Sequence, residues 1–256
     1  MNLERVGRLD GRLALVTGGT GAIGSAISAR LAGMGARVIA ICLPVELAAA
    51  ETLRAGWQAV GLNIDIAAFD VSDADATEAG LNALTDLHGG IDILINCAGI
   101  TRDAPLKRMT VQQWRQVLGV NLDSMFNTSR VLAEPMSQRG WGRIVNISSV
   151  NGQKGQFGQT NYAAAKAGVH GFTMALALEV ARKGVTVNTV APGYVDSPMI
   201  RAVPEAIRAD ILRGIPAGRF GEPEDIAAAV AFLCSHDAAY INGAQLPVNG
   251  AMYLSA

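Results

Sequence analysis

Short runs of β-branched residues alternate with longer stretches rich in alanine and leucine along this 256-residue chain. This order is typical of repeated strand–helix–strand units, whose strands lie parallel in one sheet. Several runs are almost entirely apolar, as at 91–95, where Asp92 is the one polar residue, and this suits strands covered by helices on both faces. The pattern predicts an α/β protein with a doubly wound parallel sheet. Seven strands are expected, at 13–17, 37–41, 63–69, 91–96, 143–148, 185–190 and 245–248.

The segments between the expected strands carry helix-start signals. Ser72 or Asp73, Thr110 and Pro223 each stand at the beginning of such a segment, as helix caps or as a first helical proline do. Pro135 is expected to kink or end the long helix that begins near Thr110, because proline removes a backbone donor.

Composition excludes several functional classes. The 21 Lys and Arg nearly balance the 22 Asp and Glu, so no broad basic surface for nucleic acid or for an anionic membrane is expected. No apolar run approaches the roughly 18 residues of a membrane span, and residues 1–10 lack a secretory signal, so we expect a cytoplasmic protein. Scattered cysteines and histidines predict free, mostly buried thiols and no metal site. No linker or repeat appears, so residues 1–256 are expected to form one domain.

A glycine-rich turn follows the first expected strand and opens an alanine-rich helix. Glycines let the backbone approach a pyrophosphate, and a helix N-terminus offers N–H donors and positive partial charge. A glycine-rich string alone is a weak signal, but its place between strand and helix favours a nucleotide site. The residues expected to bind are Gly18, Thr20, Gly21, Ile23 and Gly24.

Two further segments fit a bound dinucleotide. Asp70 and Val71 follow the third strand, where the carboxylate could accept a hydrogen bond from the adenine amine or could simply cap the next helix. Asn96, Ala98 and Gly99 follow the fourth strand, at the carboxyl edge where parallel sheets place ligands. A plain glycine-containing turn is the alternative there.

The strongest signal is Ser148-Ser149 at the end of a strand, followed by Tyr162 and Lys166 in a helical stretch. Four residues apart on a helix, Tyr162 and Lys166 share one face, so the ammonium is expected to lower the pKa of the phenol. A general acid is most effective when its pKa lies near the working pH. Alternation along the strand would turn only one of the two serines toward the site.

These motifs, with Asn121 and Pro192-Gly193, together resemble the short-chain dehydrogenase/reductase family over the whole chain. The resemblance implies a Rossmann-type sheet and a nicotinamide cofactor, which Pro192, Gly193 and Val195 would also contact. It implies that Tyr162 gives its proton to a carbonyl oxygen and that Ser149 hydrogen-bonds that oxygen. Lys166 would hold the ribose and lower the phenol's pKa, and Asn121 would anchor a proton-relay water.

Two positions depart from the family pattern. Ala22 stands where the glycine string usually has its middle glycine, and Cys97 replaces the second asparagine of the usual Asn-Asn-Ala-Gly. Both substitutes are small, so we expect the backbone to keep the conformation of the family at both positions.

Within the family, the segments 100–103, 139–146 and 150–162 are similar to the acetoacetyl-CoA reductases of polyhydroxyalkanoate synthesis. That resemblance implies a cytoplasmic homotetramer that reduces acetoacetyl-CoA to (R)-3-hydroxybutyryl-CoA for polyhydroxybutyrate synthesis. It also implies an acyl pocket, with a basic residue near CoA. The residues carried over are Asp103, Arg108, Ser149, Gln156, Phe157, Gln159, Tyr162 and Tyr194.

The preferred nicotinamide is predicted from the loop after the second strand. No Lys or Arg lies between Arg37 and Arg54 to pair with a 2′-phosphate. An Asp for the ribose hydroxyls is also missing, although Glu46 could take that role. The similar reductases usually use NADPH, whereas this loop favours NADH, and our prediction is NADH.

Two other functions stay open. A 3-oxoacyl-acyl-carrier-protein reductase would share the catalytic residues, and a non-catalytic nicotinamide-sensing protein would share the fold. The segment 156–159 argues against the first, and the complete set of Asn121, Ser149, Tyr162 and Lys166 argues against the second. His170, one turn after Lys166, is expected on the helix surface or at an interface.

Overall fold

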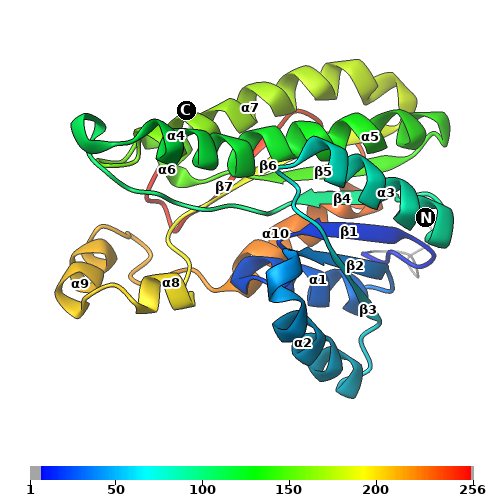
Figure 1. Ribbon diagram of the computed structural model, residues 1–256, viewed down its shortest axis with the longest axis horizontal. Helices are drawn as coiled ribbons and strands as arrows, with labels where there is room; N and C mark the ends of the chain where they lie inside the picture. Colours follow the sequence, from blue (N-terminus) through cyan, green and yellow to red (C-terminus); the bar gives the residue numbers. More distant parts are fainter. Residues whose placement is uncertain (1–6, 255–256) are drawn as a thin grey trace.

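The computed structural model describes residues 7–254, which form one seven-stranded sheet between two layers of helices (Figure 1). All strand pairs are parallel, in the order β3-β2-β1-β4-β5-β6-β7, which confirms the predicted fold class. The strands are β1 (Leu13–Thr17), β2 (Arg37–Cys42), β3 (Ile64–Ala68), β4 (Ile93–Asn96), β5 (Gly142–Ile147), β6 (Val185–Pro192) and β7 (Gln245–Val248).

Side chains along each strand point alternately to the two helical layers. On β1, Ala14 and Val16 pack with α1 (Ala22–Gly33), α2 (Leu47–Ala59) and α10 (Pro223–Cys234). The neighbouring Leu13 and Leu15 pack instead with the second layer. That layer consists of α3 (Ala74–His88), α5 (Ser124–Gln138) and α7 (Thr160–Val180). Both faces are covered, which explains the apolar runs.

The remaining elements are short and lie in the connections. They are α4 (Val111–Leu118), α6 (Val150–Lys154), α8 (Pro198–Arg201), α9 (Glu205–Arg213), and 3-10 turns at Pro44–Glu46, Leu106–Arg108, Ala181–Lys183 and His236–Ala238. No helix in residues 7–254 is long and apolar enough to cross a membrane.

The helix starts agree with the sequence prediction. The Asp73 side chain accepts from the N–H of Ala76, Thr110 caps α4, and Pro223 is the first residue of α10. Pro135 does not end the helix, which was one of its two expected effects, because α5 continues past it to Gln138.

The helix that begins after Thr110 is interrupted by a π-turn at Gly119–Asp123, which separates α4 from α5. There the Asn121 amide donates to the carbonyl oxygens of Val117 (2.8 Å) and Ile100 (2.9 Å). A side chain that inserts into the backbone ladder in this way is a recognised cause of such interruptions, which are frequent at functional sites.

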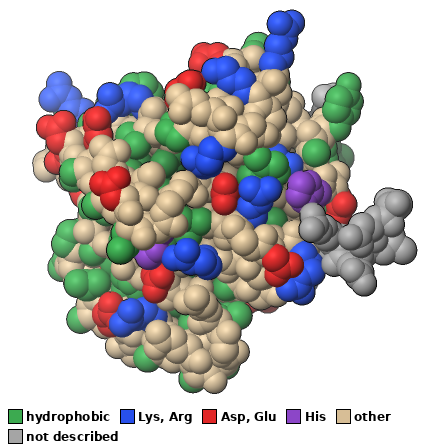
Figure 2. All heavy atoms as spheres, turned by 90° about the vertical axis from the view of Figure 1, so that its right-hand side faces the viewer, with side chains coloured by type: hydrophobic (Ala, Val, Ile, Leu, Met, Phe, Trp, Pro, Cys, Tyr) green, Lys and Arg blue, Asp and Glu red, His purple; other side chains and the backbone are tan. Residues whose placement is uncertain are grey.

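Charges of both signs are interspersed on the face shown in Figure 2, which is the right-hand side of Figure 1. Surface pairs such as Arg130 with Glu78 (2.6 Å) and Lys183 with Glu134 (3.1 Å) match the balanced composition. This face therefore has no large patch of a single charge.

Candidate active site

The strand order places a crevice at the carboxyl ends of β1 and β4. The chain moves outward from β1 in opposite directions at this point, and parallel sheets bind ligands where the order reverses. The hydroxyl of Thr17 accepts from the N–H groups of Cys97 (3.0 Å) and Ala98 (3.1 Å), so it ties the two strand ends together. The predicted residues Gly18, Ala98 and Gly99 lie at this edge.

The glycine-rich turn has the geometry of a phosphate cradle. A Cβ on Gly18 would lie 3.0 Å from Cα of Ala98, and a Cβ on Gly24 would lie 2.0 Å from the Gly18 oxygen. Gly21 is the N-cap of α1 and supplies no side-chain cap, and the first turn has no acidic residue. The N–H groups there are available to an anion, so the turn fits a dinucleotide pyrophosphate.

Thr20, Gly21 and Ile23 reach the surface of this turn. Ala22, where the family has glycine, begins α1.

The predicted residues at the ends of β3 and β4 make different contacts. Asp70 accepts from the backbone N–H (2.9 Å) and hydroxyl (2.7 Å) of Ser72, and Val71 is buried. Asn96 is 2% exposed and is held between Asn146 (2.8 Å) and Thr128 (2.7 Å). The Asn96 side chain therefore serves the core, and only its backbone is left for the crevice.

The end of β6 completes the crevice. A Cβ on Gly193 would lie 2.8 Å from Cα of Asn249, so the close approach of β6 and the chain after β7 requires glycine. Pro192 ends β6, and Val195 is buried and forms an isolated bridge to Gly221.

Ser149, Tyr162 and Lys166 come together beside this crevice. Ser149 follows β5 and caps α6, and its hydroxyl accepts from the N–H of Asn151 (3.1 Å). The Ser149 side chain lies close enough to Tyr162 to lower the pKa of its phenol. The ammonium of Lys166 lies 5.8 Å from the centre of the Tyr162 ring and donates to the Ile147 oxygen (2.8 Å). The spacing of four residues thus puts both side chains on one face of α7.

Burial governs the protonation of this pair. It raises the pKa of Tyr162 to about 12, although the Ser149 side chain acts in the opposite direction. Burial also lowers the pKa of Lys166 to about 8. The phenol is therefore a protonated donor at neutral pH, whereas the sequence argument expected its pKa to fall. The loss of contact with water dominates the pKa of Tyr162, and Lys166 is not among the groups that shift it.

Cys97, the second departure from the family pattern, adjoins the pair. Its thiol has a pKa raised to about 11 by burial, which the nearby Lys166 only partly offsets. The thiol is therefore neutral at working pH and adds no charge beside Lys166.

Ser148 and Ser149 point in different directions. The hydroxyl of Ser148 donates to the Lys166 backbone oxygen (2.7 Å) and contacts Nε2 of His170 (3.1 Å). His170 is 7% exposed, so its predicted surface position is wrong. His170 stands four residues after Lys166 and therefore shares its face of α7, which is a signal that the sequence analysis did not use.

Asn121 lies behind the lysine, in the π-turn. It is fully buried, and its Oδ1 makes no hydrogen bond to any residue between 7 and 254. A Cβ placed on Gly99 would meet that oxygen at 2.8 Å and the Lys166 nitrogen at 3.6 Å. Gly99 therefore leaves open the space that both polar groups face, which suits an ordered water.

A hydrogen-bonded chain links two predicted substrate residues. The Gln159 amide donates to Asp103 (2.9 Å), and Asn151 donates to the Gln159 oxygen (3.0 Å). A carboxylate only accepts, so Asp103 fixes the orientation of the Gln159 amide and then that of Asn151. Asn151 was missed by the sequence analysis.

The other predicted substrate residues are less closely engaged. Gln156 and Phe157 lie on the same loop with exposed side chains, Phe157 at 87%. Arg108 is exposed, and Tyr194 is partly buried just after β6.

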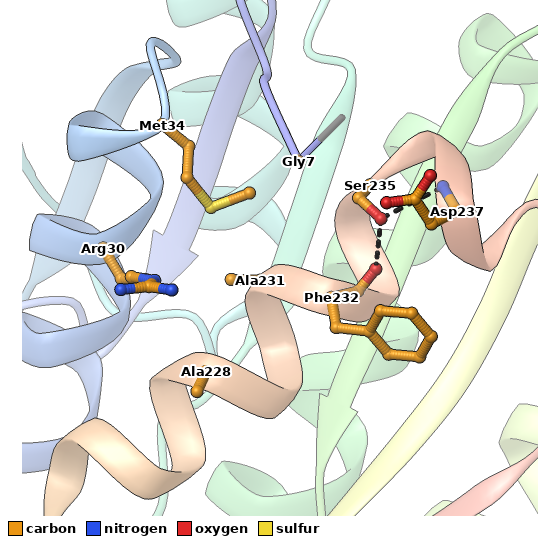
Figure 3. Close-up of a pocket in the computed structure, with 8 residues that line it drawn as sticks. All are labelled: Gly7, Arg30, Met34, Ala228, Ala231, Phe232, Ser235 and Asp237. Atoms are coloured by element: carbon orange, nitrogen blue, oxygen red, sulfur yellow. Dashed lines mark hydrogen bonds between the residues drawn. The ribbon is translucent and has the colours of Figure 1, made fainter. Parts of the chain in front are cut away.

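Two hollows lie away from these residues. One, of about 220 Å³, lies between the ends of α1 and α10, with Arg30 and Met34 on one side and Phe232 on the other (Figure 3). The second, of about 370 Å³, is lined by α1, α2, α8 and the start of α10. Neither is lined by Ser149, Tyr162 or Lys166. Residues 7–254 contain no group of three or more metal-ligating side chains.

Residues 12–208 match the family model for short chain dehydrogenases. The chain belongs to this family, and it is an NAD(P)H-dependent oxidoreductase. Similar proteins include the acetoacetyl-CoA reductases of Allochromatium vinosum (52% identical over 95% of this chain and 99% of the relative) and Cupriavidus necator (48%, over 95% and 98%). A 3-oxoacyl-acyl-carrier-protein reductase of Vibrio cholerae is 47% identical over 96% of this chain and 99% of the relative.

Proposed function

We propose that this enzyme reduces acetoacetyl-CoA to (R)-3-hydroxybutyryl-CoA. The observation that carries the proposal is the meeting of the Ser149–Tyr162 pair with the Asp103–Gln159 pair through Asn151. The hydroxyls of Ser149 and Tyr162 can hydrogen-bond and protonate a carbonyl oxygen. The amide of Gln159, oriented by Asp103, can hydrogen-bond the thioester of the substrate. The similarity to acetoacetyl-CoA reductases over nearly the full length supports this substrate.

The proposed roles follow from charge development. A bound reduced nicotinamide would supply the hydride, held by Gly18, Gly21 and the start of α1. Tyr162 donates its proton to the carbonyl oxygen as negative charge builds there, and Ser149 donates a hydrogen bond to the same oxygen. Lys166 favours the phenolate left behind and holds the ribose, while Asn121 positions the water that returns a proton.

The remaining predicted residues would bind the cofactor or orient the substrate. The cofactor contacts proposed are Thr20, Ile23, Gly24, Asp70, Val71, Asn96, Ala98, Gly99, Pro192, Gly193 and Val195. Gln156, Phe157 and Tyr194 would wall the acyl group, and Arg108 would approach the CoA phosphates.

We propose NADH as the preferred cofactor. Glu46 lies just beyond β2 and accepts from the backbone N–H of Leu43 (3.1 Å). Burial and then the carboxylates of Glu46 and Glu51 raise the pKa of Cys42 at the end of β2. This negative charge would repel a 2′-phosphate, and no cation in the loop would attract one.

Glu46→Gln is expected to raise kcat/KM for NADPH relative to NADH about fivefold, as removal of roughly 1 kcal/mol of repulsion would. The amide keeps an oxygen for the Leu43 N–H. The control is Glu51→Gln, because Glu51 is paired with Arg54 (2.7 Å) one turn further along α2. Steady-state rates with both cofactors measure the ratio, and an equal change in both variants would contradict the role of Glu46.

The rate of reduced-nicotinamide oxidation with acetoacetyl-CoA, in parallel with NADH and NADPH, tests the function. We expect turnover that is faster with NADH. A 3-oxoacyl-acyl-carrier-protein substrate, run beside it, tests the runner-up reductase, which the Vibrio cholerae relative favours. Turnover of the carrier-protein substrate alone would overturn the proposed substrate, and cofactor binding without any turnover would favour a sensor.

We further propose that residues 1–256 act as one domain in a cytoplasmic homotetramer of polyhydroxybutyrate synthesis. Three free thiols among the described residues suit a reducing compartment. Helices α4, α5 and α7, in the upper part of Figure 1, expose apolar side chains that suit subunit contacts. These are Val111, Trp114, Phe126, Met174 and Leu178.

A further inference from the structure

Ser148 and His170 form a buried contact directly behind the catalytic pair. The Ser148 hydroxyl lies 2.7 Å from the backbone oxygen of Lys166 and 3.1 Å from Nε2 of His170. Ser148 is 3% exposed and His170 is 7% exposed. The proton-donating mechanism uses neither side chain, so both need another explanation.

The directions of the hydrogen bonds follow from the donor count. The Lys166 backbone oxygen can only accept, so the single hydroxyl proton of Ser148 points to it. Toward His170, Ser148 must therefore accept, which places a proton on Nε2 of the imidazole. A neutral imidazole then has a bare Nδ1, and this atom is buried without a hydrogen bond to any described residue.

The contact between Ser148 and His170 lies beside the groups that bind Lys166. The Lys166 ammonium donates to the oxygen of Ile147, the residue before Ser148 (2.8 Å). From the other side, a Cβ on Gly152 would lie 2.7 Å from the Lys166 carbonyl carbon, so α6 packs directly against this turn of α7. The end of β5 therefore binds Lys166 at both its backbone and its ammonium.

We propose that Ser148 and His170 are positioning residues that lock the Lys166 turn of α7 onto the end of β5, and that His170 does so only as the neutral Nε2–H tautomer. Because Ser149 follows Ser148 directly, the lock also sets the distance between Ser149 and Tyr162. The proposal rests on the proposed reductase function only where turnover is the readout.

Protonation of His170 would keep the Nε2–H bond to Ser148 but would destabilise this arrangement. It would create an N–H at Nδ1 with no acceptor in the described surroundings, and it would place a second cation near the Lys166 ammonium. Burial first, and then Lys166, lower the pKa of His170 from its ordinary value of 6.5. Lys166 is the charged group that acts on His170, and Ser148, the residue after β5, is the polar group that faces it.

Four variants test the lock through turnover. Ser148→Ala and His170→Leu are each expected to lower kcat about tenfold, with KM for substrate and cofactor within about twofold, since both variants remove the buried hydrogen bond between Ser148 and His170. The kcat of the double variant should fall no further than that of the less affected single variant, because the two residues act as one unit. His170→Gln keeps an N–H donor and does not titrate. It should retain kcat at neutral pH and should lack the acid-side loss of kcat that is expected of the wild type.

A second readout does not depend on activity. Imidazole-nitrogen NMR, with the His170 signals assigned by their loss in His170→Gln, should show the Nε2–H tautomer staying neutral below pH 6.5. Ser148→Ala should alter that tautomer or its titration. An Nδ1–H tautomer, titration at the ordinary pKa, or additive losses of kcat would each overturn the proposal. If acetoacetyl-CoA is not turned over at all, the proposed function fails while the NMR result still decides the lock.

Discussion

Tyr162→Phe is expected to lower kcat by about two to four orders of magnitude, the range typical of a lost general acid. Because burial raises the pKa of Tyr162 to about 12, the phenol carries its proton throughout the neutral range. Phenylalanine preserves the ring beside Ser149 and Lys166 and removes only the donating hydroxyl. The Kd for reduced nicotinamide should change by less than about twofold, since the glycine-rich turn and the residues after β4 and β6 are untouched.

Single-turnover rates and a cofactor fluorescence titration measure the two quantities separately. Tyr240→Phe is the matched control, because Tyr240 is fully exposed and should leave both unchanged. Residual turnover within tenfold of the wild type would mean that another group or water protonates the substrate. A parallel loss of cofactor binding would instead assign Tyr162 a binding role.

The fold could be predicted because its main constraint, the burial of both faces of the sheet, determines the sequence pattern of the strands. Strands covered on both faces must be apolar at successive positions, so β1 and β4 appear as continuous hydrophobic runs. The ends were less certain. Strand β4 begins at Ile93, two residues later than expected, although the backbone of Asp92 already hydrogen-bonds Leu13 (2.9 Å) and Arg143 (3.0 Å).

The catalytic pair was predictable for a similar reason, since helical spacing alone puts Tyr162 and Lys166 on one face. The residues that pack around Tyr162 and Lys166 could not be predicted in this way. The buried face of α7 includes Asn161, Lys166, His170 and Thr173, so apolar periodicity gives no sign that His170 points inward. Its partner Ser148 directly follows β5, and only the three-dimensional arrangement brings the two residues together.

The π-turn around Asn121 and the core position of Asn96 were missed for a related reason. Each asparagine is fixed by groups distant in sequence: Asn121 by Ile100, and Asn96 by Asn146 and Thr128. A motif can nominate a polar residue for a site, but it does not say whether the side chain or only the backbone faces the ligand.

Gly24→Ala is expected to weaken nicotinamide binding at least tenfold and to lower the free energy of unfolding by about 1–3 kcal/mol, as overpacking does. The added Cβ would lie 2.0 Å from the Gly18 oxygen and 2.9 Å from Cα of Gly19. Both contacts are with backbone, so no side chain can rotate away, and the turn that cradles the pyrophosphate must move off the start of α1.

Gly33→Ala provides the comparison within the same helix. A Cβ there meets nothing within 4 Å, so the change should leave cofactor Kd unaltered and should stabilise the protein by about 0.4–1 kcal/mol. Urea unfolding and a cofactor titration on both variants give the two numbers. Equal stability and affinity in Gly24→Ala and Gly33→Ala would show that the turn can relax without losing its ligand. The close packing of Gly18 against Gly24 would then not be what shapes the cofactor site.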